Sequence, residues 1–200
     1  APASEVADWV PGEYKRCTID GLGKFVRWRE TELVITAGPY SGGKSLFSQI
    51  LVQDFVKSTG LPVSIFAWED SAEKLRAGFI RYRDTVMRDE GGDAVETFLD
   101  KIRIAKIDSS RDRFLSDYFD LAEYQAKRFG TKFFVFDPWN EFDHQKHSKQ
   151  SETEYVREVM KSARRLIDRN KIIANFNTHV SAEFVGSDGS IKPFKAIHSF

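Results

Sequence analysis

Short apolar runs alternate with longer amphipathic runs along most of the chain. The apolar runs predict strands at Leu33–Ala37, Val63–Trp68, Ile102–Lys106, Lys132–Asp137 and Ile172–Thr178. Between them, apolar positions recur at helical spacing and predict helices at Lys44–Ser58, Ala72–Arg88, Arg111–Phe129 and Glu152–Arg169. Because strands that alternate with helices form βαβ units, we expect an α/β fold with a mainly parallel, twisted sheet and helices on both of its faces.

Composition narrows the class of protein. The chain has 200 residues, of which 41% are hydrophobic and 30% charged, as in ordinary globular domains. Thirty basic residues balance 30 acidic ones, which argues against coating nucleic acid by bulk charge but leaves room for a local basic groove. Cys17 is the single cysteine, so an internal disulfide is excluded and a reducing compartment is favoured. No apolar run approaches the roughly 18 residues that span a bilayer, so no membrane contact is expected.

The segment GPYSGGKS follows the first predicted strand and precedes the first predicted helix. It fits the phosphate-binding pattern G-x-x-x-x-G-K-[ST] without a mismatch. Glycines let successive backbone N–H groups wrap a phosphate chain, and the helix N-terminus adds a favourable potential. We expect Lys44 to reach the β- and γ-phosphates of ATP and the Ser45 hydroxyl to bind Mg²⁺. The predicted nucleotide-binding residues are Gly38, Pro39, Tyr40, Ser41, Gly42, Gly43, Lys44, Ser45 and Leu46.

Acidic residues follow two further predicted strands. In a parallel sheet ligands lie beyond the carboxyl ends of the strands, so these residues are candidates for the same site. Glu69 follows the second strand and could polarise a water for attack on the γ-phosphate, or could serve with Asp70 or Ser71 to begin the next helix. Asp137 ends the fourth strand and could hold the Mg²⁺ shell opposite Ser45, or could be a turn residue before Pro138.

Two regions near the predicted strand ends are more ambiguous. Thr178 and His179 follow the fifth apolar run, where a polar side chain could contact the γ-phosphate, although a lone histidine is often only structural. The polar stretch Asn140–Glu152 could contact nucleic-acid phosphates or simply connect two elements. Its His144 and His147 have no third ligand at a metal-like spacing, so we do not expect a metal site there.

These strand ends together resemble the ATPase core of the RecA-like hexameric replicative helicases of the DnaB, Twinkle and phage primase–helicase type. The resemblance runs from about Thr18 to Glu183. It rests on VSIFAWEDSAEKLRAGFIRY after the phosphate loop, on FFVFDPWNEF as the Walker B strand, and on NTHVS as the sensor segment. The resemblance implies that Glu69 is the catalytic base, that Asp137 is the Walker B acid, and that His179 senses the γ-phosphate.

The resemblance also implies a function, partners and a location. It implies an ATP-hydrolysing, Mg²⁺-dependent motor that translocates on single-stranded DNA during replication. Its subunits would form a ring, expected to be a hexamer in the full-length protein, in a bacterial or phage-infected cytoplasm, while a mitochondrial matrix location stays open. The segments Asn140–Ser151 and those after Val180 correspond to the family's DNA-contacting loops.

The same resemblance divides the chain into two parts. Residues 1–17 are expected to be a lead-in linker, and residues 18–200 the RecA-like P-loop core. The family continues with further strands and an arginine finger, which are not expected within these residues.

Two other functions remain open from the sequence. A P-loop nucleoside or nucleotide kinase would need an arginine-bearing lid, and the stretches RDTVMRDEGGD and SSRDRF supply arginines. A non-hydrolysing RecA-like switch or loader would bind nucleotide without turnover. Glu69 directly after the second strand fits the motor better than the kinase.

Overall fold

Five parallel strands form the central sheet of the computed structural model, which describes residues 15–89, 91–105, 114–139 and 151–179. Across the sheet the order is β3 (Leu33–Gly38), β7 (Ile173–His179), β6 (Phe133–Asp137), β4 (Val63–Ala67) and β5 (Ile102–Ala105). Every neighbouring pair is parallel. The carboxyl ends of all five strands therefore lie along one edge, which is where ligands bind in open α/β sheets.

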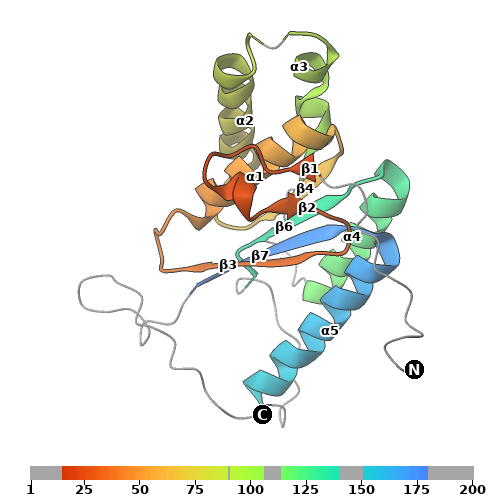
Figure 1. Ribbon diagram of the computed structural model, residues 1–200. Coiled ribbons are helices and arrows are strands. Elements are labelled where there is room, and N and C mark those ends of the chain that lie inside the picture. Colours follow the sequence, from red (N-terminus) through yellow and green to blue (C-terminus); the bar gives the residue numbers. More distant parts are fainter. Residues whose placement is uncertain (1–14, 90, 106–113, 140–150, 180–200) are drawn as a thin grey trace.

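Helices cover both faces of this sheet (Figure 1). On one face lie α1 (Lys44–Thr59) and α2 (Ala72–Val86), and on the other lie α4 (Leu115–Phe129) and α5 (Glu152–Asn170). The short helix α3 (Asp93–Thr97) and the 3₁₀ turn η3 (Leu99–Lys101) lead into β5. The predicted α/β class, with a parallel sheet between two helical layers, is confirmed.

All nine predicted elements are present, with small differences at their ends. The helix α2 ends at Val86 rather than at Arg88, and α4 begins at Leu115. Ser71 caps α2 by accepting a hydrogen bond from the Lys74 backbone N–H at 3.2 Å. A capping box between Ser151 and Glu154 begins α5. Both helices begin where a side chain satisfies a helix N–H group that would otherwise be unpaired.

The central strands carry almost continuous apolar sequence because both of their faces are buried. In β6, Phe133 and Val135 face α1, whereas Phe134 and Phe136 face α4 and α5. All four side chains are at most 1% exposed. Since successive side chains of a strand point to opposite faces, a strand between two helical layers must be apolar at every position.

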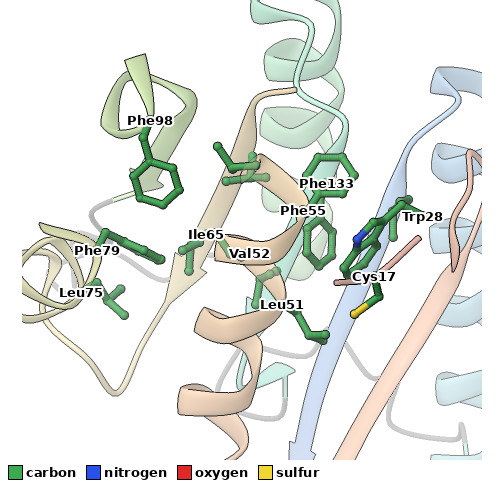
Figure 2. Packing of buried hydrophobic residues seen from close by; sticks show 14 of the residues in the cluster. Cys17, Trp28, Leu51, Val52, Phe55, Ile65, Leu75, Phe79, Phe98 and Phe133 are labelled. Carbon is green, nitrogen blue, oxygen red and sulfur yellow. The ribbon is translucent and has the colours of Figure 1, made fainter. Parts of the chain in front are cut away.

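A small antiparallel hairpin that the sequence pattern did not predict packs beside α1. Its strands are β1 (Lys15–Arg16) and β2 (Arg27–Trp28), with the turn η2 (Leu22–Lys24) between them. Figure 2 shows Cys17 and Trp28 against Leu51 and Phe55 of α1. The Trp28 ring meets Phe55 edge-on, with centroids 5.4 Å apart. Burial raises the pKa of the Cys17 thiol to about 11, so this thiol is an inert part of the core.

A buried carboxylate attaches the hairpin to α1. Asp54 is 3% exposed and accepts hydrogen bonds from the Thr18 backbone N–H and from the Trp28 indole Nε1, both at 2.8 Å. The Thr18 hydroxyl also donates to the same carboxylate. Because an acid that accepts several donors can remain buried, Asp54 fixes the position of the hairpin on α1. No helix within the described ranges is both long enough and apolar enough to cross a membrane.

Replacing Asp54 by alanine should destabilise the protein by about 3 kcal/mol, because it leaves the buried donors of Thr18 and Trp28 unpaired. Urea unfolding followed by tryptophan fluorescence measures this loss. The matched control is Asp20→Ala, which removes only an exposed contact to the Gly21 N–H. Equal effects of the two substitutions would show that Asp54 does not hold the hairpin.

Candidate nucleotide site

The phosphate loop joins the end of β3 to the start of α1. Gly43 has φ 78° and Ser41 has φ 57°, so two residues of the loop adopt the left-handed conformation. A Cβ on Gly42 would lie 2.9 Å from the Pro39 carbonyl oxygen, a distance that real side chains do not reach. The sequence GPYSGGKS therefore folds into a tight loop that opens onto the N-terminus of α1.

Lys44 is buried at the centre of the site. It is 8% exposed, and its Nζ donates to the carbonyl oxygens of Gly38 at 3.2 Å and Pro39 at 2.8 Å. Burial lowers the pKa of Lys44, and the negative charges of Glu69 and Asp137 oppose this change. A lysine held by carbonyls and acids beneath a loop of N–H donors is well placed to pair with an incoming phosphate.

His179 links Lys44 to Glu69. Its Nδ1 lies 2.9 Å from Lys44 Nζ, and its Nε2 lies 3.2 Å from the Glu69 carboxylate. An ammonium group only donates, so Nδ1 accepts and the proton lies on Nε2, which donates to Glu69. The three predicted catalytic residues thus form one chain of contacts, although they come from α1, the end of β4 and the end of β7.

Asp137 lies at the end of β6, 6% exposed, beside Ser45 and Asn177. Burial raises the pKa of its carboxyl group, and hydrogen bonds from Asn177 and Ser45 oppose the rise. The charges of Glu69 and Asp70 add to the rise. Among the described residues, its Oδ1 has no hydrogen-bond partner. A buried, unpaired carboxylate oxygen next to a serine hydroxyl fits a Mg²⁺ ion or the water that the ion would hold.

A buried polar network that the sequence analysis missed lies beneath the loop. Asn175 donates to Ser48 and to Asn177 at 3.0 Å, and Ser48 donates to Asn177 Oδ1 at 2.8 Å. Thr36 of β3 donates to Asn175 Oδ1 at 2.9 Å. The network joins β3, β7 and α1, which are the elements that carry the phosphate loop and His179. The signal for it was present in the sequence as two asparagines with period two in an otherwise apolar strand.

The pocket in front of the loop extends along α2. It has a volume of about 570 Å³ and is lined by residues 41–46 of the loop, by Glu69 and His179, and by Gln49, Asp70, Lys74, Ala77, Gly78 and Arg81. Lys74 and Arg81 are seven residues apart and lie on the same side of α2. A Cβ on Gly78 would lie 3.1 Å from Gln49 Oε1, so the glycine permits α1 and α2 to lie close together. The sequence analysis missed this wall.

Other predicted residues of the loop and of β7 lie in different positions around the pocket. Gly38 and Pro39 contribute carbonyl groups to Lys44, and the Tyr40 ring stacks on His179. Thr178 Oγ1 lies 3.4 Å from the His179 carbonyl oxygen, and Thr178 does not line the pocket.

The expected DNA-contacting loops fall at 140–150 and beyond 179, which is outside the described residues. Ser151, at the end of the first of these stretches, instead caps α5.

Comparisons with known proteins identify the fold. No protein-family model matches the chain, and no curated protein matches it. Among solved structures, 399 chains match, too many for the fold alone to select one activity. One of them, the ATPase domain of a DnaB-like helicase, has a TM-score of 0.57 and 12% sequence identity over 78% of this chain. This chain covers 60% of the length of that structure. The similarity shows a RecA-like P-loop α/β fold.

Replacing Asp137 by asparagine should stabilise the Mg²⁺-free protein by about 1 kcal/mol at neutral pH, because it removes a buried, incompletely paired charge. A folded-state pKa above the ordinary value means that the ionised carboxylate opposes folding. The penalty is absent below the unfolded pKa and is complete once the pH has risen through the folded pKa. The difference between Asp137→Asn and the original protein should therefore grow with pH. Thermal unfolding at several pH values, with EDTA, measures it, and a pH-independent difference would contradict it.

Proposed function

We propose that the chain is the ATP-hydrolysing motor domain of a ring-forming helicase that moves along single-stranded DNA. The observation that carries this proposal is the contact chain Lys44–His179–Glu69 at the mouth of a phosphate loop. It brings a phosphate-binding cation, a polar sensor and a carboxylate base to one pocket. The similarity to a helicase ATPase domain supports nucleotide hydrolysis.

Each residue has a distinct role in the proposed hydrolysis. The loop N–H groups and Lys44 hold the β- and γ-phosphates, and Ser45 with Asp137 would hold Mg²⁺. The metal would neutralise charge on the phosphates. Glu69, whose side chain is 45% exposed beside the pocket, orients a water and accepts its proton. His179, whose side chain is 5% exposed, donates toward the γ-phosphate once Lys44 turns to the ligand.

An apolar surface beside the phosphate loop supports assembly into a ring. Leu46, Phe47 and Ile50 of α1 are 62%, 37% and 36% exposed. Exposed apolar side chains that cluster beside a site are typical of protein interfaces. In the ring that the sequence resemblance implies, nucleotide lies between neighbouring subunits, so this surface would face the neighbour.

A nucleotide kinase is the second candidate, since Lys74 and Arg81 line the pocket and could bind a phosphoryl acceptor. The arginines that the sequence offered for a lid do not support it. Arg83 pairs with Asp84, and Arg88 donates to the Asp84 carbonyl oxygen at 2.9 Å. The stretch SSRDRF lies almost wholly outside the described residues. Transfer of labelled phosphate from ATP to a nucleoside monophosphate would favour the kinase over the motor.

Replacing Glu69 by glutamine should lower the ATP hydrolysis rate at least about 100-fold, because the water loses its base. Nucleotide binding should persist, since the loop and Lys44 are unchanged. Steady-state phosphate release with and without single-stranded DNA measures turnover, and a fluorescent nucleotide measures binding.

The matched control for this experiment is Asp70→Asn, because Asp70 is the next acid and pairs with Lys74 at the start of α2. It should lower turnover far less than Glu69→Gln. If Glu69→Gln hydrolyses ATP at the original rate, Glu69 is not the base and the motor mechanism fails. Binding by both variants with no turnover by the original protein, even with DNA, would favour the nucleotide switch.

Replacing Arg81 by alanine should weaken nucleotide binding about fivefold, which corresponds to roughly 1 kcal/mol for an exposed charge contact. Arg81 lies about 10 Å along α2 from Lys74, so it would meet a part of the nucleotide remote from the reacting phosphate. Arg83→Ala is the control, since Arg83 lies on the same helix but outside the pocket lining. Titration at low and high salt measures both, and equal affinities would remove Arg81 from the site.

A further inference from the structure

We infer that Tyr40 is a positioning residue that orients His179 and thereby connects the phosphate loop to the end of β7. The inference rests on the proposed nucleotide hydrolysis. The Tyr40 and His179 rings are stacked, with centroids 3.8 Å apart and planes inclined by 13°. Tyr40 belongs to the phosphate loop, whereas His179 is the last residue of a strand far along the chain.

The stack supplies the orientation that the two hydrogen bonds of His179 leave undetermined. Lys44 and Glu69 contact opposite edges of the imidazole, at Nδ1 and Nε2. Two contacts at the ring edge define an axis but permit rotation about it. A flat aromatic ring against one face of the imidazole removes that rotation, and near-parallel stacking of this kind is favourable.

The backbone of the loop directs Tyr40 to this position. Tyr40 stands between Pro39, whose φ is fixed by its ring, and Ser41, whose φ is 57°. The Gly42 N–H donates to the Pro39 carbonyl at 3.1 Å and closes the turn around Tyr40. Tyr40 is nevertheless 68% exposed, so its ring contributes little to the core. Its contact with His179 is therefore a better explanation of its place than packing is.

Nucleotide binding changes the partners of this assembly. A phosphate in the loop competes with His179 for the Lys44 ammonium group. When Lys44 turns to the phosphate, His179 keeps Glu69 and the Tyr40 ring. The stack thus holds the imidazole over the pocket when its hydrogen bond from Lys44 is lost, and the change at Nδ1 reports phosphate at the end of β7.

The first test observes the imidazole directly in nucleotide-free protein, so that it does not depend on hydrolysis. Long-range proton–nitrogen spectra should show His179 with its proton on Nε2 and its carbon-bound protons shifted upfield by the Tyr40 ring. His179→Gln assigns the signal among the four histidines of the chain. Tyr40→Ala should abolish the upfield shift and broaden the signal, whereas Tyr40→Phe should keep both features. An unchanged His179 signal in Tyr40→Ala would overturn the inference, whatever the protein hydrolyses.

The second test separates positioning from nucleotide contact. Tyr40→Ala should lower kcat about tenfold, because a small displacement of a catalytic group is costly, while the nucleotide Kd changes less than about twofold. Tyr40→Phe should recover most of the turnover. Tyr124→Ala, which removes another exposed tyrosine on α4, is the control and should change neither quantity. A raised Kd with unchanged kcat would make Tyr40 a nucleotide contact and overturn the inference. A protein without any turnover would fail the proposed function, and the spectral test would then decide the inference alone.

Discussion

The burial of Lys44 at the meeting point of three strand ends is the constraint on which the site depends. A lysine that is 8% exposed needs acceptors, and the fold supplies them from the loop carbonyls and from His179. The charges of Glu69 and Asp137 also favour the ammonium form. These groups can surround one ammonium only because all five strands are parallel and end at the same edge. An antiparallel partner would place its residues at the opposite edge of the sheet.

The same constraint explains why polar groups lie under the loop instead of a continuous apolar core. Asn175 and Asn177 are fully buried, yet they hydrogen-bond within a network that includes Ser48 and Thr36, so β3, β7 and α1 are held in one register. Buried polar groups of this kind are tolerated when they are paired, and they specify a single arrangement. At the ligand side, Asp137 Oδ1 and Asn177 Nδ2 have no hydrogen-bond partner among the described residues. Incomplete pairing there is stability given up for a site that a ligand completes.

Sequence periodicity was sufficient for the layered fold and for the identity of the loop, but not for the contacts between distant residues. The nine long elements have clear periods or continuous apolar runs, and β6 is apolar throughout because helices cover both its faces. The strands β1 and β2 have two residues each, too short to show a period, so the hairpin was missed. Glu69 and His179 could be assigned to one edge from topology alone. Their link through Lys44, and the stack of Tyr40 on His179, depend on loop conformation and could not be predicted.

The arrangement of the pocket separates two parts of ligand recognition that a motor must keep apart. The groups around Lys44 and Asp137 are buried and fixed by β3, β6 and β7, so they are suited to act on phosphate with little change in position. Lys74 and Arg81 lie along α2, where they would meet whatever extends beyond the phosphates. Because His179 belongs to the first group and also ends β7, the loss of a phosphate would be felt first at the end of that strand. The proposed motor could therefore respond to hydrolysis at β7 without first disturbing the part of the pocket that retains the nucleotide.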